Sequence, residues 1–254
     1  MAADLGRRFG GVARLYGAAG AARLADAHVA VVGIGGVGSW AAEALARTGV
    51  GAITLIDLDM VAESNTNRQI QALGEVYGQA KVDAMAERIR AINPWCAVTP
   101  IEDFVTPENV AALLHGGHAA VIDAIDQVRA KAAMIAHCRD QSIPIVTAGA
   151  AGGQIDPTQI AAADLARTTQ DPLLARLRSV LRRDYGFPRD GKKKFGVTAV
   201  FSTEALRYPA ADASCDPGNG PAGLNCAGFG SSVCVTAAFG LAVAAQVINR
   251  IAHP

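Results

Sequence analysis

A glycine-rich turn that joins a short apolar run to an alanine-rich stretch constrains the fold of this chain more than any other feature. From residue 28 the sequence reads HVAVVGIGGVGSWAAEALARTGVGAITLIDLD, so a second apolar run follows the alanine-rich stretch and ends at Asp57. A β-branched run, a glycine turn, a helical stretch and another β-branched run are typical of one βαβ unit. The two strands of such a unit are parallel, and its helix packs on the sheet that they form.

The same alternation continues beyond this unit. Three further apolar runs, at residues 97–101, 119–122 and 143–146, are separated by helical stretches at about 81–92, 107–114 and 127–140. Strands that alternate with helices predict an α/β fold, in the form of a doubly wound, mostly parallel, Rossmann-like sheet with helices on both faces.

The C-terminal part of the chain, about residues 151–254, is expected to elaborate this sheet. It contains a strand at 159–163, a helix at about 171–185, a strand at about 196–202 and a crossover rich in Gly, Pro and Asn at 209–223. No linker long enough to separate two cores divides it from the first part, about residues 1–150. We therefore expect a single domain over residues 1–254.

The composition limits the class of protein. With 51% hydrophobic and 18% charged residues, the chain of 254 residues is too apolar to be disordered. Its 23 basic and 23 acidic side chains exclude a uniformly basic nucleic-acid coat protein. The five cysteines include no CxxC pair, which argues against a disulfide scaffold and a cysteine-based zinc site. We expect a reducing, cytoplasmic location, since the N-terminal residues contain no apolar segment typical of a signal peptide.

The stretch at residues 228–248 contains no charged side chain and is long enough to cross a membrane. Ala, Gly, Ser and Thr dominate it, and such residues gain little free energy on entering hydrocarbon. A buried helix that packs on the sheet or on a second subunit is therefore the favoured interpretation. Membrane association is the less favoured alternative.

The glycine turn predicts a phosphate-binding site. Glycines let phosphates approach the N-terminus of the following helix, whose free N–H groups and positive dipole end bind anions. Asp57, at the end of the next strand, is placed to accept hydrogen bonds from a ribose. The four glycines concerned are Gly33, Gly35, Gly36 and Gly38. The turn by itself does not distinguish NAD from ATP.

The polar residues at the following strand ends favour ATP. They are Asp59, Asn65, Asn67 and Arg68 after the second strand, Lys81 at the next helix start, and Asp123 and Asp126 at the fourth strand end. Taken singly, each is equally typical of a surface charge, a helix cap or a turn. Together, two cations and two carboxylates at one sheet edge suit a triphosphate with Mg²⁺. Arg68 and Lys81 would balance phosphate charge, and Asp126 would hold the metal.

These residues occur as GxGGxG, DxDxxxxSNxNRQ, GQxK and DAxD, in that order. In this pattern the chain resembles the E1-like adenylating enzymes, which include the ubiquitin-activating enzymes and the adenylyltransferases of bacterial sulfur-carrier proteins. The resemblance implies that Gly36 lies against the phosphates and Asp57 binds the ribose. It also implies that Asn65, Arg68 and Lys81 face the polyphosphate and that Asp126 faces the metal.

Further segments narrow the resemblance to one branch of the family. These are RFGGVARLYG, EDFVTPENV, GAAGGQIDPTQI, VFSTEALRYP and CAGFGSSVCVTAAFG. They are similar to the branch that dehydrates N6-threonylcarbamoyladenosine at position 37 of tRNA. The resemblance implies that ATP activates the substrate carboxylate as an acyl adenylate and that the neighbouring carbamoyl group then closes the ring. Because that closure is intramolecular, no enzyme nucleophile is required.

The resemblance carries several further expectations. An arginine reaches the ATP phosphates across a dimer in this family; Arg8 and Arg14 are the candidates here, with Arg14 favoured, and either implies a homodimer. Cys226 is the candidate for thioester or persulfide chemistry, and its alternative interpretation is a small buried side chain. A cysteine desulfurase and its sulfur-acceptor protein are associated with this branch. The paired zinc cysteines of the sulfur-carrier adenylyltransferases do not occur in the sequence.

Residues 167–194 are the candidate tRNA surface. Nine basic and three acidic side chains give this segment a charge of +6 on a neutral protein. The proposed contacts are Arg176, Arg178, Arg182, Arg183, Lys192, Lys193 and Lys194. Tyr185, Phe187 and Phe195 lie among them and either stack an unpaired base or anchor the core. The alternative for the charges is an ordinary solvated helix and loop.

Two other functions fit parts of the sequence. An adenylyltransferase of a sulfur-carrier or ubiquitin-like protein would need a groove for a protein tail in place of a basic face. A non-catalytic nucleotide-binding or membrane-associated module would not need Arg68, Lys81 and Asp126 together. The missing cysteine pairs and the basic segment favour the tRNA enzyme over the sulfur-carrier adenylyltransferase. The joint presence of Arg68, Lys81 and Asp126 favours an enzyme over the non-catalytic module.

Overall fold

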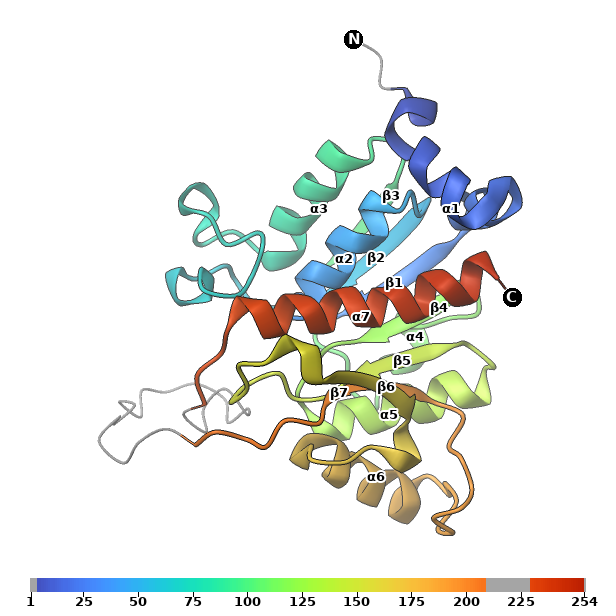
Figure 1. Ribbon diagram of the computed structural model, residues 1–254, viewed down its shortest axis with the longest axis vertical. Coiled ribbons are helices and arrows are strands. Elements are labelled where there is room, and N and C mark those ends of the chain that lie inside the picture. Colours follow the sequence, from blue (N-terminus) through green and yellow to red (C-terminus); the bar gives the residue numbers. More distant parts are fainter. Residues whose placement is uncertain (1–3, 209–228, 254) are drawn as a thin grey trace.

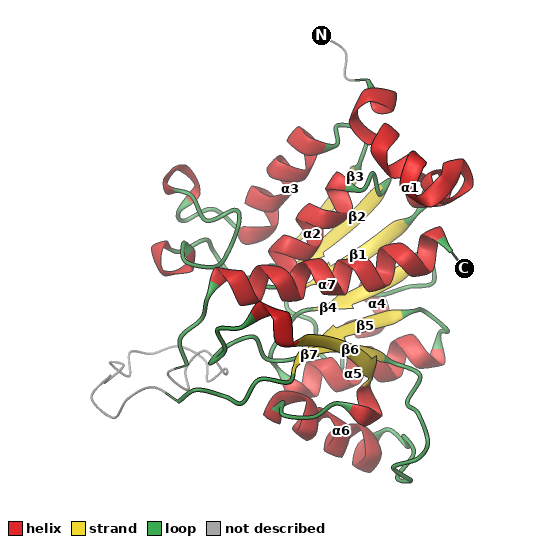
Figure 2. Ribbon diagram, in the orientation of Figure 1, coloured by secondary structure: helices red, strands yellow, loops and turns green. Residues whose placement is uncertain are grey.

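The computed structural model describes residues 4–208 and 229–253, and one sheet runs through the molecule (Figures 1 and 2). Its strands lie in the order β3-β2-β1-β4-β5-β7-β6. They are β1 (His28–Val32), β2 (Ala52–Ile56), β3 (Ala97–Ile101), β4 (Ala120–Asp123), β5 (Ile145–Ala148), β6 (Ile160–Asp164) and β7 (Thr198–Ser202). All neighbours are parallel except β6, which is antiparallel to β7. The predicted mostly parallel, Rossmann-like sheet is confirmed.

Helices cover both faces of the sheet. They are α1 (Leu5–Asp26), α2 (Gly38–Arg47), α3 (Lys81–Ile92), α4 (Val110–Leu113), α5 (Val128–Asp140), α6 (Pro172–Asp184) and α7 (Val233–Ala252). Short 3₁₀ helices occur at Glu63–Asn65, Gly74–Val76, Pro157–Gln159 and Leu165–Arg167. Buried side chains of α1, α2, α3 and α7 pack with one face of the sheet in a first large core cluster, and those of α4, α5 and α6 pack with the other face in a second. A small third cluster contains Val61, Ala72 and Ala84.

The central strand β1 contributes to both core clusters. Val29 and Val31 pack with the α2 and α7 side, whereas Ala30 and Val32 pack with the α5 and α6 side. A parallel strand covered on both faces needs apolar residues at every position, because successive side chains point to opposite faces. This is why HVAVV is a continuous apolar run.

Helix α7 is part of the core. Among the described residues it is the one helix with the length and composition of a membrane span. In this fold, however, Val235, Phe239, Val243 and Val247 pack against the sheet and α2, and Figure 1 shows the helix lying across the sheet. The favoured interpretation, a buried helix over 228–248, therefore has the right role, but the helix begins and ends later than expected.

The N-terminal helix α1 is a feature that the sequence analysis did not anticipate. The helix contains several glycines, which lower helix propensity, and it is kinked at Gly17. Contacts with α7 hold it in place, since Arg23 donates to the backbone oxygen of Ile251 and Gly20 lies against Ala252. Tertiary contact thus decides the conformation of a segment that local sequence leaves ambiguous.

Three histidines cluster where β1 and β4 begin, at the amino-terminal edge of the sheet. The ring of His118 lies 4.5 Å from that of His28 and 4.6 Å from that of His115, measured between centroids. His118 Nε2 is buried and has no hydrogen-bond partner among the described residues. Burial lowers the pKa of His118 from 6.5 to about 4, and burial also lowers that of His28.

This cluster predicts a pH-dependent stability. In the unfolded chain His118 binds a proton below about pH 6.5, whereas in the folded protein it stays neutral down to about pH 4. The free energy of unfolding should therefore rise between these two pH values as pH increases. Urea unfolding at about pH 5 and about pH 7 measures this slope, which should be smaller in His118→Asn. An equal slope in the variant would contradict the assignment.

Candidate active site

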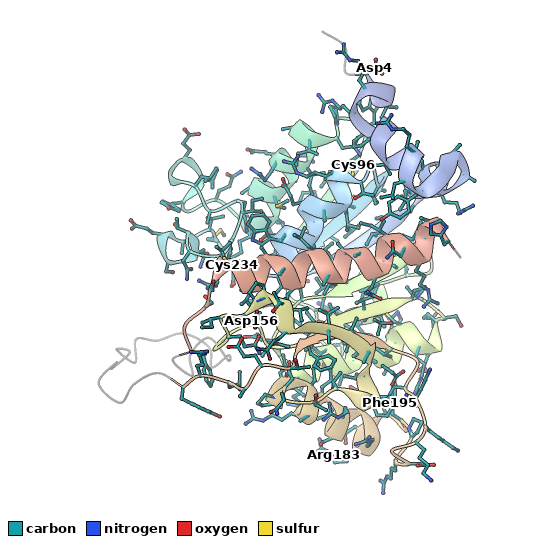
Figure 3. The ribbon with its side chains drawn as sticks, viewed as in Figure 1. Asp4, Cys96, Asp156, Arg183, Phe195 and Cys234 are labelled. Carbon is teal, nitrogen blue, oxygen red and sulfur yellow. The ribbon has the colours of Figure 1, made fainter. Side chains whose placement is uncertain are left out.

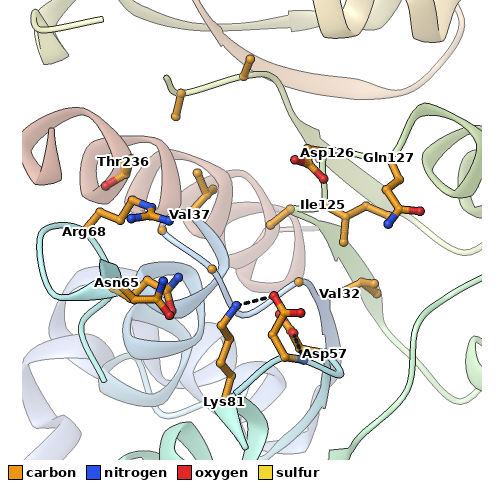
Figure 4. Close-up of a pocket in the computed structure, with 18 of the residues that line it drawn as sticks. Val32, Val37, Asp57, Asn65, Arg68, Lys81, Ile125, Asp126, Gln127 and Thr236 are labelled. Carbon is orange, nitrogen blue, oxygen red and sulfur yellow. Dashed lines mark hydrogen bonds and ion pairs between the residues drawn. The ribbon is translucent and has the colours of Figure 1, made fainter. Parts of the chain in front are cut away.

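A cavity of about 650 Å³ opens at the carboxyl ends of β1, β2, β4 and β5 (Figure 4). Its volume is in the range of small-molecule and cofactor sites, and its position is where ligands bind in open parallel sheets. Most of the candidate residues line it: Gly33, Gly35, Gly36, Asp57, Asp59, Asn65, Arg68, Lys81 and Asp126. Segments far apart in the sequence therefore meet at one place.

The glycine turn allows the close packing of α2 against the end of β1. A Cβ atom on Gly38 would lie 1.7 Å from the carbonyl oxygen of Gly33. Gly33 itself has a φ of +87°, a conformation that favours glycine. Gly38 does not line the cavity, so its expected contact with the nucleotide is corrected to a packing role. Gly35 and Gly36 present the backbone to the cavity, beside the N-terminus of α2.

Asp57 is held at one end of the turn. Its carboxylate accepts hydrogen bonds from Ile34 N at 2.6 Å and from Asp59 N at 2.9 Å. Burial raises the pKa of Asp57, and the neighbouring Lys81 and these two hydrogen bonds oppose that effect. The carboxylate is therefore fixed in direction at the end of β2, in the position from which a ribose is bound.

The exposed ring of Phe104 lines the same cavity and was not singled out from the sequence.

The two cations approach from neighbouring elements. Lys81 is the first residue of α3, and its Nζ lies 2.6 Å from Asp59 Oδ2. Arg68 donates to Ser64 O and to Asn67 Oδ1, both at 2.9 Å, and burial lowers its pKa. Asn67 does not line the cavity, so its expected contact with the nucleotide is corrected to orienting Arg68.

Asn65 is buried and organises the loop that carries Arg68. Its Oδ1 accepts a hydrogen bond from Ala62 N at 3.0 Å, and Arg68 N donates to Asn65 O. The short 3₁₀ helix that ends at Asn65 therefore presents Arg68 to the cavity.

Asp126 lies across the cavity from Arg68 (Figure 4). Within residues 4–208 and 229–253, no group of three His, Cys, Asp or Glu side chains is arranged to hold a metal ion. A carboxylate with a neighbouring Gln127 suits Mg²⁺, which is commonly bound by one or two carboxylates together with substrate phosphates and water. Asp126 thus fits a metal that arrives with a nucleotide.

Asp123 was expected to contact the nucleotide, but the structure places it in the interior and not among the residues that line the cavity. Its side chain is 0% exposed and lies 3.0 Å from Nζ of Lys131, which is also 0% exposed. Thr147 Oγ1 donates to the same carboxylate at 2.6 Å. Asp123 is the last residue of β4, enclosed by β1 and β5, whereas Asp126 lies beyond the sheet.

Lys131 links the two loops that form one wall of the cavity. In addition to Asp123, its ammonium group donates to Ile125 O at 2.8 Å and to Ala148 O at 2.9 Å. The adjoining loop is held by Asp171, which accepts from Ala150 N at 2.8 Å and whose pKa burial raises. Sequence reasoning missed both residues; the one available signal for Lys131 was a lysine in the otherwise apolar part of the 127–140 helix.

The basic segment divides into packed and exposed side chains. Arg178 donates to Thr168 Oγ1, and Arg182 lies over the ring of Phe195 with 5.2 Å to its centroid. Phe195 and Phe187 are buried, and their rings pack in a tilted arrangement with 5.0 Å between centroids, so these two rings are core anchors. Among the proposed tRNA contacts, the exposed side chains are Arg176, Arg183, Lys192, Lys193 and Lys194. Arg183 pairs with Asp184 and lies, with Phe195, at the end of the molecule that Figure 3 shows at the bottom.

Two candidates lie elsewhere in the chain. Arg14 is exposed on α1 and does not line the cavity of its own chain. Arg8, the alternative, donates to the backbone oxygens of Ala91 and Ile92 at the end of α3. Arg14 is therefore the freer of the two for a contact across a dimer. Cys226 lies outside the described residues.

The chain is similar to proteins of known activity. A family model described as the ThiF family matches residues 10–253. The tRNA threonylcarbamoyladenosine dehydratase of Escherichia coli strain K12 is 57% identical over 250 residues, which cover 96% of this chain and 93% of that protein. A crystal structure of the E. coli tRNA N6-threonylcarbamoyladenosine dehydratase with ATP gives a TM-score of 0.88 at 55% identity, over 99% of this chain and 96% of that one. The structure with AMP gives a TM-score of 0.88 at 55% identity, over 99% and 97%.

The buried pair of Lys131 and Asp123 predicts a large effect on stability. Lys131→Met leaves a buried carboxylate without its counter-charge and should lower the free energy of unfolding by about 3–5 kcal/mol. The double variant with Asp123→Asn should lose less than the two single variants combined, because neither charge remains. Urea unfolding of the four proteins measures the coupling. Additive losses would contradict a direct interaction.

Proposed function

The chain belongs to the ThiF family, and from this membership and the geometry of the cavity we infer that it catalyses the ATP-dependent dehydration of N6-threonylcarbamoyladenosine in tRNA. The observation that carries this conclusion is the gathering of Arg68, Lys81 and Asp126 around the glycine turn. A hydride-transfer site has no need of two cations and a carboxylate at that place. A polyphosphate with a divalent metal does.

The chemistry follows from the poor reactivity of a carboxylate. A carboxylate oxygen of the threonyl group bonds to the α-phosphorus of ATP, and pyrophosphate leaves. The carbamoyl group of the same nucleoside then attacks the acyl carbon, and the bond to AMP breaks. The carboxylate thus loses one oxygen, which leaves on AMP, and the attacking carbamoyl group releases one proton. Counted from the neutral carboxylic acid, the nucleoside loses one water. Both reacting groups are on one molecule, so proximity supplies much of the rate.

The residues of the cavity have distinct roles in this reaction. The backbone of Gly35 and Gly36 and the N-terminus of α2 bind the phosphates. Asp57 binds the ribose, which fixes the position of the α-phosphorus along the turn. Arg68 and Lys81 offset the charge that develops on the departing pyrophosphate. Bound Mg²⁺ would supply further charge compensation there, with Asp126 as its protein ligand.

We propose further that tRNA binds over the exposed cations of the basic segment, namely Arg176, Arg183 and Lys192–Lys194. Arg178 and Arg182 are committed to Thr168 and Phe195, so their contribution is smaller. We also propose a homodimer in which Arg14 of one protomer contacts the polyphosphate bound to its partner. The proposed location is cytoplasmic. Sulfur-transfer partners that act through Cys226 remain a hypothesis from the family resemblance.

A direct assay tests the function. Purified protein, ATP, Mg²⁺ and tRNA that carries threonylcarbamoyladenosine are incubated, and the nucleosides are analysed by mass spectrometry after digestion. The modified nucleoside should lose the mass of one water only when ATP is present. An unchanged nucleoside with protein that binds ATP would refute the activity.

Asp126 should be essential for adenylation. Asp126→Ala removes the proposed metal ligand, so AMP formation should fall to background while the fold is retained, because the side chain lines a cavity and is not buried in the core. AMP is measured by chromatography at several Mg²⁺ concentrations, and circular dichroism checks the fold. Asp126→Asn is the matched control with the same shape and no charge. Turnover by Asp126→Ala at the wild-type rate would show that Asp126 has no role in adenylation.

Charge reversal should identify the tRNA surface. Arg176→Glu and Lys193→Glu change exposed side chains and should weaken tRNA binding while ATP affinity stays the same. Each lost phosphate contact should reduce the slope of log K against log salt by about 0.7–0.9. Filter binding across a salt series measures this slope, with Asp190→Asn as a control in the same loop. Unchanged tRNA affinity in both variants would show that these side chains belong to an ordinary solvated surface.

A further inference from the structure

The first turn of α7 reaches the cavity from the far end of the chain. Ser231 and Thr236 line the cavity, and Ser232 between them caps the helix, with its side chain accepting from Cys234 N. Neither lining residue was a candidate from the sequence. The core helix α7 therefore also completes the site that the glycine turn begins.

Thr236 has an unused hydroxyl in this wall. The residue is 3% exposed, and its Oγ1 has no hydrogen-bond partner among the described residues. A buried hydroxyl without a partner is unfavourable, since it loses its hydrogen bonds to water and gains none in return. The residue lines the cavity, so a ligand there is placed to supply the missing partner.

Thr236 and Arg68 flank the same point of the glycine turn. A Cβ atom built on Gly36 would lie 3.3 Å from Cδ of Arg68 and 3.4 Å from Cβ of Thr236. Figure 4 shows the Thr236 hydroxyl near the Arg68 side chain. Ser231 is tied to the same loop, since Asn67 Nδ2 donates to Ser231 O at 3.3 Å.

The electrostatics of this corner favour an anion. The N-termini of α2 and α7 both lie beside the turn, and the first turn of neither helix contains an acidic residue. Their dipoles therefore add to the charge of Arg68. A hydroxyl, a guanidinium and two helix N-termini are the partners that phosphoryl oxygens require.

We propose that Thr236, Ser231 and the N-terminus of α7 form, with Arg68, the subsite for the terminal phosphoryl groups of ATP and for the pyrophosphate that leaves. The inference rests on the ATP binding in the proposed function. The expected direction of the nucleotide supports it. Asp57, the expected ribose ligand, accepts a hydrogen bond from Ile34 N at the start of the turn. Gly36 comes two residues later, and Arg68 and Thr236 lie next to it. AMP, which lacks the two terminal groups, would not reach the Thr236 hydroxyl.

The test compares ATP and AMP binding by calorimetry without tRNA. Thr236→Val keeps the shape and removes the hydroxyl, and should weaken ATP binding about tenfold, as expected for the loss of a hydrogen bond to a charged group. AMP affinity should not change, and inhibition by added pyrophosphate should weaken in parallel. Thr236→Ser should restore ATP affinity. Thr54→Val is the control, a buried threonine in β2 outside the cavity. It breaks the hydrogen bond between Thr54 Oγ1 and His28 Nε2, so stability should fall while both affinities stay unchanged.

Three outcomes would overturn the proposal. Equal weakening of ATP and AMP would place the hydroxyl at the α-phosphate or show a general disturbance of the fold. Weaker tRNA binding with unchanged ATP affinity would assign the same corner to an RNA phosphate or to the substrate carboxylate. No change in any affinity would leave Thr236 without a ligand. The proposed function is tested by a different experiment. It would be refuted if wild-type protein that binds ATP left the modified nucleoside in tRNA unchanged, whatever the result for Thr236.

Discussion

The close approach of α2 to the end of β1 is the constraint on which the site depends. The first residue of α2 packs directly on the carbonyl group of Gly33, which leaves no room for a Cβ atom. The helix N-terminus is thereby brought to the sheet edge, and the hydrogen bond from Ile34 N to Asp57 ties the turn to the next strand. A nucleotide laid along this turn meets a positive dipole, a fixed carboxylate and free backbone at once.

Charge is concentrated in the cavity although the protein is neutral overall. Lys81 and Arg68 face the place of the polyphosphate, while Asp126 stands on the opposite wall. Directly behind that wall, Lys131 and Asp123 form a second ion pair that no solvent reaches. The inner pair holds the loops, and the outer charges line the cavity. Two acidic residues three positions apart therefore have unrelated roles.

The C-terminal part of the chain is built into both the sheet and the site. Strand β7 continues the parallel sheet beside β5, β6 closes its edge, and α7 covers its face next to α2. The apolar composition of α7 follows from this burial. Ser231 and Thr236, at its first turn, line the cavity, so the helix that stabilises the core also forms part of the cavity wall.

The sequence by itself determined the βαβ unit, the order of strands and helices along the chain and the glycine turn, because each depends on local periodicity or on a motif within a short segment. It also singled out Asp57, Arg68 and Lys81, which line the cavity. Only the tertiary structure separated Asp123 from Asp126, since burial depends on the strands that lie on either side of β4. It alone also placed Phe195 in the core, formed α1 against α7 and brought Thr236 to Gly36. Contacts between residues distant in the chain decide these features, and they leave no periodic trace in the local sequence.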